Sequence, residues 1–296
     1  MCRSELLDWT QVLNNKTRLL VVGLASLGLA AVQTLPSLAA STPGELTDAE
    51  LEVILSKGKI IKRENIGAGV TNPVRLWLQR DGNTVSASFK DVDFERRGMT
   101  RFASGNSELN FTDSYKYERA AYLLDRELGL RMVPVTVIRK IYSGPGAVSL
   151  WIGNSITGAE RIRQGLRPPD LSKLIHQQAD MRIFDALIYN TDRHAENQLY
   201  TLADWQLHLI DHSRAFRTRP ELPESFATRP MTIERSLLTT LEALNESQLK
   251  KLLKRELGPT QIKSILARRD LVLEKLEKDR LEYGDAFAFR DTKPVP

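Results

Sequence analysis

Residues 189–197 read YNTDRHAEN, and residues 208–213, HLIDHS, follow them after a short interval. Asp192 and Asn197 lie five residues apart, and Asp211 ends an apolar run fourteen residues after Asn197. Phosphoryl transfer requires a carboxylate beside the attacking group and oxygen ligands that hold Mg²⁺ across the nucleotide phosphates. The ordered set therefore predicts that Asp192 faces an acceptor and that Asn197 and Asp211 bind the metal ion.

The two aspartates differ in how readily a structural role explains them. Aspartates such as Asp192 also cap turns after helices, so its position alone is ambiguous. Asp211 follows the alternating apolar residues Leu207 and Leu209, which indicate a buried strand. A carboxylate buried at the end of that strand needs a cation beside it, and Mg²⁺ is the simplest candidate.

Upstream of these stretches, the chain has the pattern of short strands. A β-branched run that starts at Ile60 ends in the glycine-rich turn Gly67-Ala68-Gly69. Residues 75–80 and 84–90 flank Asp81-Gly82, a dipeptide typical of hairpin turns. We therefore expect a small antiparallel sheet with a glycine-rich turn near its beginning.

The next part of the chain predicts one helix and a second hairpin. Residues 91–113 are polar, and we expect them to be irregular. Residues 114–129 carry apolar residues at spacings of three and four and end in glycine, which predicts a helix. Residues 133–142 and 147–152 flank Ser143-Gly144-Pro145-Gly146, which predicts a second hairpin turn.

From Asp170 onward the balance shifts to helix. Residues 171–189 form one periodic segment whose buried stripe is expected to include Ile175. A short hairpin is predicted over 198–210. Three more helices are expected over 233–244, 246–257 and 259–283. The predicted fold class is α+β, with a strand-rich amino-terminal half that carries one helix and a helical carboxy-terminal half.

These motifs together resemble a known family. Asp192-Arg193-His194 with Asn197, followed by Ile210-Asp211, is similar to the catalytic and metal-binding motifs of the atypical kinases. That superfamily includes the phosphoinositide 3- and 4-kinases, the secreted Golgi casein kinase and four-jointed group, and the bacterial persistence-toxin kinases. The resemblance spans roughly Ile60 to Leu257 and implies a two-lobed protein-kinase-like fold.

The resemblance also implies how a nucleotide would be held. Gly67 and Gly69 would belong to the turn that covers the nucleotide, and Lys90 would reach its phosphates. Glu118 would steady that lysine, so we predict an ion pair between Lys90 and Glu118 although 28 residues separate them. Taken singly, turn glycines, a strand-end lysine and a helix glutamate are common surface features.

The implied activity is that of an ATP- and Mg-dependent phosphotransferase. Asp192, assisted by His194, would act as the base toward an unknown hydroxyl-bearing acceptor on a protein, a lipid head group or a glycan, while Asn197 and Asp211 would hold Mg²⁺.

The chain also departs from the family pattern. Ser213 stands where many kinases have glycine, so the conformational flip of the segment around Asp211 is not implied. The animal secreted kinases are disulfide-bonded, whereas this chain has a single cysteine.

Two other classes of function compete with the kinase interpretation. His194, His208 and His212, with Asp192 and Asp211, suggest a metal-dependent hydrolase. Histidines four residues apart on a strand lie about 13 Å from each other, too far to share one zinc ion. We instead expect His212 to support Asp211. The third class is a nucleotide-binding pseudokinase or scaffold that kept the fold and lost turnover.

Composition limits the partners. The chain has 296 residues, of which 42% are hydrophobic and 27% charged, as in ordinary globular proteins. A net charge of +5 is too small for a protein that coats itself with nucleic acid, so no nucleic-acid partner is expected.

The amino-terminal segment predicts export. Basic residues precede an apolar run over 19–32, and Ala39-Ala40 supplies small residues for a signal peptidase. We expect a signal peptide over 1–40 and a linker with a short helix over 41–59. The lobes are expected over 60–153 and 154–296. The mature protein would be periplasmic or secreted, with a membrane contact only through an uncleaved signal anchor.

Overall fold

The computed structural model describes residues 46–67, 74–101, 107–141 and 144–291. These residues belong to one compact unit. The predicted signal peptide lies outside them. Within the described residues, no helix combines the length and the apolar character needed to cross a membrane.

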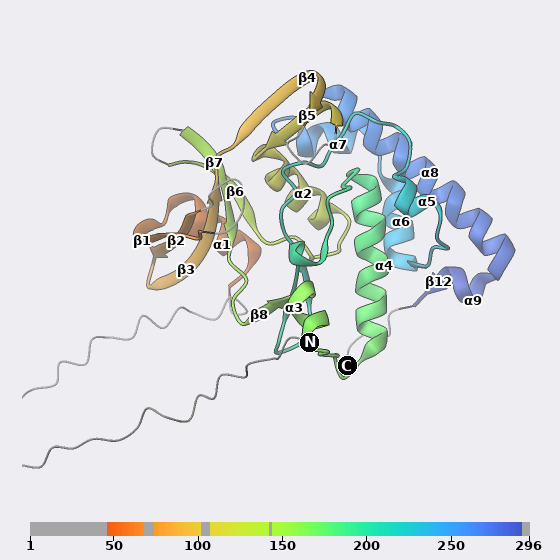
Figure 1. The fold of residues 1–296 in the computed structure, drawn as a ribbon, viewed down its shortest axis with the longest axis horizontal. Helices are drawn as coiled ribbons and strands as arrows, with labels where there is room; N and C mark the ends of the chain where they lie inside the picture. Colours follow the sequence, from red (N-terminus) through yellow and green to blue (C-terminus); the bar gives the residue numbers. More distant parts are fainter. Residues whose placement is uncertain (1–45, 68–73, 102–106, 142–143, 292–296) are drawn as a thin grey trace, which may run out of the picture. The chain divides into compact units, whose positions relative to one another are not determined.

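An antiparallel sheet of five strands dominates the amino-terminal half (Figure 1). Its strand order is β1-β2-β3-β7-β6, so a three-stranded meander, β1-β2-β3, is joined through its edge strand β3 to β7 of the β6–β7 hairpin. The strands are β1 (Lys59–Asn65), β2 (Val74–Arg80), β3 (Asn83–Lys90), β6 (Thr136–Ile141) and β7 (Gly144–Leu150). Apolar residues of this sheet form one continuous core cluster with residues of the carboxy-terminal helices.

Two helices pack with this sheet, and local sequence signals explain both. Helix α1 (Asp48–Lys57) begins with a capping box between Thr47 and Glu50, which satisfies backbone N–H groups at its first turn. Helix α2 (Lys116–Glu127) ends just before Gly129, whose φ of +73° suits glycine. The predicted helix in this region is therefore confirmed.

The expectation that residues 91–113 are irregular is wrong. They contain the hairpin of β4 (Asp93–Arg101) and β5 (Ser107–Ser114), which form a separate two-stranded sheet. Phe94 and Met99 are 50% and 60% exposed, and the side chains of this hairpin that the structure describes form no regular buried apolar face. A strand without a buried face has no alternating pattern to reveal it.

The second predicted hairpin exists, but three of the four residues predicted to form its turn lie in strand β7. Gly144, Pro145 and Gly146 belong to strand β7, and Gly146 pairs with Arg139. A Cβ atom on Gly146 would lie 2.4 Å from a ring atom of Phe89, so the close approach of β3 excludes a side chain there. Within the Gly-Pro-Gly sequence, Gly146 thus serves the packing of neighbouring strands.

The carboxy-terminal half is mainly helical, as predicted. A small sheet of β8 (Ser155–Thr157), β9 (Gln198–Thr201) and β10 (Leu207–Leu209) accompanies the helices, and β11 (Ile233–Glu234) pairs with β12 (Phe289–Arg290). The helices are α3 (Gly158–Arg163), α4 (Leu171–Leu187), α5 (Glu224–Ala227), α6 (Arg235–Ala243), α7 (Glu246–Leu253), α8 (Pro259–Tyr283) and α9 (Asp285–Ala288), with a 3-10 turn over Ala195–Asn197.

Helix α4 buries its second half rather than its whole length. Ile175, expected in the buried stripe, is 59% exposed, because the first turns of α4 extend beyond the core. Met181, Ile183 and Phe184 are buried. The core therefore anchors the carboxyl end of α4, from which the segment containing Asp192 departs.

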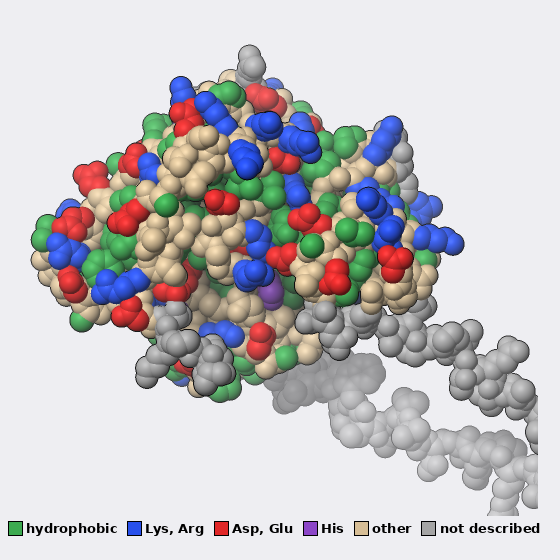
Figure 2. Space-filling model, turned by 180° about the vertical axis from the view of Figure 1, so that it is seen from behind, with side chains coloured by type: hydrophobic (Ala, Val, Ile, Leu, Met, Phe, Trp, Pro, Cys, Tyr) green, Lys and Arg blue, Asp and Glu red, His purple; other side chains and the backbone are tan. Residues whose placement is uncertain are grey.

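Charged side chains are mixed over the surface seen in Figure 2, where basic and acidic groups lie among apolar ones. This mixture agrees with the near balance of 42 Lys and Arg against 37 Asp and Glu.

Candidate active site

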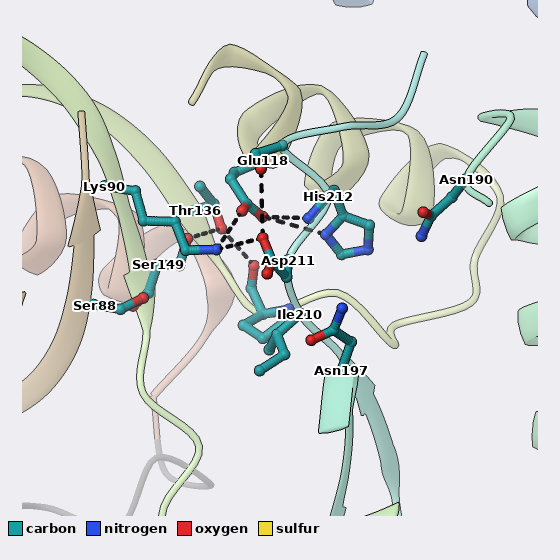
Figure 3. A network of polar contacts seen from close by, with 12 residues as sticks. Ser88, Lys90, Glu118, Thr136, Ser149, Asn190, Asn197, Ile210, Asp211 and His212 are labelled. Atoms are coloured by element: carbon teal, nitrogen blue, oxygen red, sulfur yellow. Dashed lines mark hydrogen bonds and ion pairs between the residues drawn. The ribbon is translucent and has the colours of Figure 1, made fainter. Parts of the chain in front are cut away.

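Three charged side chains from distant parts of the sequence meet at the end of strand β3 (Figure 3). Lys90 is the last residue of β3, Glu118 lies in the first turn of α2, and Asp211 follows β10. The Lys90 Nζ atom lies 2.9 Å from Glu118 Oε1 and 2.8 Å from Asp211 Oδ1. The predicted ion pair between Lys90 and Glu118 is confirmed, and Asp211 joins it.

Mutual attraction keeps this cluster charged. Burial by itself would lower the pKa of Lys90, but the carboxylates of Glu118 and Asp211 outweigh burial and raise it. Burial would likewise raise the pKa of Glu118, but the charge of Lys90 and a hydrogen bond from His212 hold it well below its usual value. The lysine is therefore a fixed cation, and the glutamate a fixed anion, at neutral pH.

His212 supports a different residue from the one expected. Its backbone N–H donates to Glu118 Oε2 at 3.2 Å, and its Nδ1 atom lies 3.3 Å from the same oxygen. The ring is buried against Phe184, and burial lowers the pKa of His212. The prediction that His212 supports Asp211 is wrong, because the chain turns at Asp211 and carries the following residue toward α2.

Asp211 and Asn197 offer oxygen atoms suited to a divalent cation. Both contacts of the Asp211 side chain, from Lys90 and from the Ser213 hydroxyl, use Oδ1. The Asn197 amide group donates through Nδ2 to the Asp192 carbonyl. Within the described part of the chain, no hydrogen bond uses Asp211 Oδ2 or Asn197 Oδ1.

These two residues also lie next to each other. The Ile210 N–H donates to the Asn197 carbonyl at 3.1 Å, and Figure 3 shows both side chains on adjoining segments. Asp211 has a φ of +63°, a backbone conformation that non-glycine residues rarely adopt and that is common at functional sites. One carboxylate and one amide oxygen fit Mg²⁺, which completes its shell with water and phosphate oxygens.

Arg193 holds these segments together, a role that the sequence analysis missed. Its Nη1 atom donates to the carbonyls of Asn197 at 2.9 Å and Ile210 at 2.7 Å, while Nε contacts the Asp185 carboxylate. The Arg193 side chain is 6% exposed. The available signal was Asp185 itself, an acidic residue within the buried part of α4 that needed a cationic partner.

Asp192 lies apart from the lysine cluster and is paired with a residue that was not expected. Its Oδ2 atom is 3.3 Å from Arg214 Nη1, and both side chains are more exposed than those of Lys90 and Glu118. The Asp211 side chain is 46% exposed, so the expectation that Asp211 is buried is wrong. Arg214 also lies over the ring of Phe111, so the β4–β5 hairpin borders this position. His194 is exposed, and its Nε2 atom lies 3.3 Å from Asn197 Nδ2. Its assistance to Asp192 stays a prediction.

The glycine-rich turn is described in part. Gly67 has a φ of +66°, and a Cβ atom there would meet nothing within 4 Å, so its conformation rather than space favours glycine. Gly69 lies outside the described residues. The role of this turn over a nucleotide stays a prediction.

The hydrolase interpretation gains no support from the geometry. His208 lies on β10, a strand as predicted, and burial lowers its pKa to about 4. Across the described ranges, no three His, Cys, Asp or Glu side chains form a group able to hold a metal ion.

Comparison with solved structures identifies the fold. The sequence matches no protein-family profile and no curated protein. The structure of hydra Fam20 with sugar has a TM-score of 0.62 at 17% identity, covering 82% of this chain and 92% of that chain. The Golgi casein kinase with Mn/ADP bound has a TM-score of 0.62 at 14% identity, covering 84% and 80%. The chain is similar to these proteins in fold, and its fold is that of an atypical kinase.

Proposed function

We propose that the protein is an ATP- and Mg-dependent phosphotransferase that acts on a hydroxyl group of a protein, a lipid head group or a glycan. The observation that carries this proposal is the contact of Lys90 with both Glu118 and Asp211. A lysine fixed between two carboxylates, next to an asparagine oxygen, suits the phosphates and metal ion of a nucleotide.

Each residue has a separate part in the proposed transfer. Lys90 offsets phosphate charge, and Glu118 keeps it in place. Asp211 and Asn197 would hold Mg²⁺, which neutralises charge on the phosphates when bound. Asp192 orients the acceptor hydroxyl and accepts its proton as the acceptor oxygen bonds to the γ-phosphorus and the bond from that phosphorus to the ADP oxygen breaks.

The structural neighbours support a nucleotide as the phosphate donor, but they do not indicate which acceptor this chain uses. One of them is described with Mn/ADP and another with sugar. By analogy of fold, we propose a nucleotide and a divalent cation for this chain, and a hydroxyl-bearing acceptor of one of the three named classes.

The test combines binding and transfer. The full chain would be titrated with Mg-ATP by calorimetry and incubated with labelled ATP and, separately, dephosphorylated casein, phosphoinositide vesicles and a glycan. We expect binding and labelling of at least one acceptor, with Asp192→Asn as the control that binds without labelling. Binding without transfer to any acceptor would favour the pseudokinase, and zinc-dependent hydrolysis without ATP would favour the hydrolase.

We also propose that the mature protein begins near Ser41 and lies outside the cytoplasm. The support is the basic segment, the short apolar run and Ala39-Ala40. Amino-terminal sequencing of the protein from its native host is the test. A chain that still begins at Met1 and fractionates with the cytosol would contradict the proposal.

A further inference from the structure

A cavity of about 740 Å³ lies between α1, the start of α2, β6 and the segment after α7. None of Lys90, Glu118, Asp192, Asn197 and Asp211 lines it. Its volume is within the range of small-molecule sites in proteins. The cavity is therefore a candidate second site on the other side of α2 from the lysine cluster.

The lining combines apolar surface with an excess of positive charge. Val53 and Ile138, on α1 and β6, are 39% and 37% exposed. Four cations line the cavity against two carboxyl groups, namely Lys57, Lys116, Arg119 and Arg255 against Glu52 and Glu256.

Two of these cations are already neutralised. Arg119 pairs with Glu52 at 3.2 Å, and Lys116 pairs with Asp93 at 2.7 Å. Lys57 and Arg255 form no ion pair within the described ranges of the chain. The cavity thus presents exposed apolar side chains together with two cations outside these ion pairs, one of which, Arg255, interacts electrostatically with the neighbouring carboxylate of Glu256.

We propose that this cavity binds a small amphipathic anion, whose apolar body covers Val53 and Ile138 and whose acidic group is attracted by Lys57 and Arg255. The argument is charge complementarity combined with exposed apolar area. Glu256 opposes such a ligand, so its removal should strengthen binding.

Binding is coupled to the lysine cluster through α2, an inference that rests on the proposed function. Tyr115, Lys116 and Arg119 line the cavity, and Glu118 lies between them in sequence but contacts Lys90. A molecule that bridges α1 and α2 restrains the helix that positions Glu118. Linkage then requires nucleotide and ligand to change each other's affinity by the same factor.

The test uses the fluorescent probe 1-anilinonaphthalene-8-sulfonate, an aromatic anion that brightens in apolar surroundings, titrated into the full chain without nucleotide. We expect saturable binding at one site, weakened about tenfold or more by Lys57→Glu with Arg255→Glu and strengthened several-fold by Glu256→Gln. Lys278→Glu, which changes an exposed lysine of α8, is the control and should leave the affinity for the probe unchanged. Equal affinity in all four proteins, or titration without saturation, would overturn the site.

A second titration tests the coupling. We expect saturating Mg-ATP to change the probe's affinity at least threefold in the wild type. A change below twofold despite Mg-ATP binding would overturn the coupling and leave the site standing. Absence of Mg-ATP binding would overturn the proposed function and the coupling together, while the nucleotide-free titration would still report on the cavity.

Discussion

The lysine cluster and the Asp192–Arg214 pair both join opposite charges, but they do so in different surroundings. The side chains of Lys90 and Glu118 are 20% and 6% exposed, whereas those of Arg214 and Asp192 are 36% and 44% exposed. Lys90 contacts Glu118 at 2.9 Å and Asp211, whose side chain is 46% exposed, at 2.8 Å, while Arg214 lies 3.3 Å from Asp192. In the proposed kinase, Lys90 and Glu118 would thus be fixed before a nucleotide binds, whereas Asp192 would stay accessible to solvent and to an acceptor.

This difference has an energetic consequence. Removing one partner from a buried pair leaves an uncompensated charge, whereas an exposed pair contributes little because water screens both groups. In the proposed kinase, the pair that would hold phosphate is therefore more rigid than the pair that would face the acceptor. Four predictions follow this contrast, from the largest effect to the smallest.

Asp211→Ala should abolish Mg-dependent ATP binding and, with it, transfer. The variant removes the one carboxylate of the proposed metal-binding pair and one of the two partners of Lys90. Calorimetry with Mg-ATP measures the loss, and Asp270→Ala, which changes an exposed aspartate of α8, is the control. Unchanged affinity in Asp211→Ala would refute its assignment to the nucleotide side.

Asp192→Asn should reduce transfer about a hundredfold to ten-thousandfold, the range for loss of a general base. Its affinity for Mg-ATP should change less than about twofold, because Asp192 makes no contact with Lys90 in the described structure. Steady-state transfer and calorimetry on the same preparation measure both quantities. If nucleotide affinity fell as far as in Asp211→Ala, the division into two sides would be wrong.

Glu118→Gln should destabilise the fold by about 3 kcal/mol at pH 7, since it leaves Lys90 and the His212 N–H without their buried anion. The pKa of Glu118 is held below its ordinary value of 4.5, so this stabilisation is present above pH 4.5 and is lost as pH falls further. Urea unfolding should show the difference between variant and wild type shrinking below that pH. Glu127→Gln, on the exposed side of the same helix, is the control.

Arg214→Gln should destabilise the fold less than Glu118→Gln does, because the exposed pair with Asp192 contributes less than about 1 kcal/mol. Nucleotide affinity should stay at the wild-type value. Urea unfolding alongside Glu118→Gln gives the comparison directly. A loss as large as that of Glu118→Gln would show that the acceptor side is as rigidly assembled as the nucleotide side.

Local signals predicted much of this architecture. The capping residues of α1, the glycine after α2 and the proline that begins α8 mark helix ends through short-range hydrogen bonding and sterics. Asp192, Asn197 and Asp211 stood out because their types and spacing suit phosphoryl transfer, and their roles stay predictions. The hairpin over β4 and β5 was missed because its described side chains form no regular buried face.

Other features depended on contacts between distant segments. The structure pairs His212 with Glu118, Arg193 with Asp185, and Arg214 with Asp192. The spacing of these residues along the chain does not indicate which partner each of them contacts. Gly146 was predicted to lie in a turn, and its role in strand packing was missed. Its closeness to Phe89 arises only when β3 and β7 pair.

The sequence by itself determined the fold class, the bounds of most helices and the kinds of group that the site contains, because these follow from periodicity, capping and side-chain chemistry along the chain. The tertiary structure alone decided how the charges are paired and which are buried. A pair's strength depends on distance and exposure to water, and both are set by packing between segments as far apart as Lys90 and Asp211.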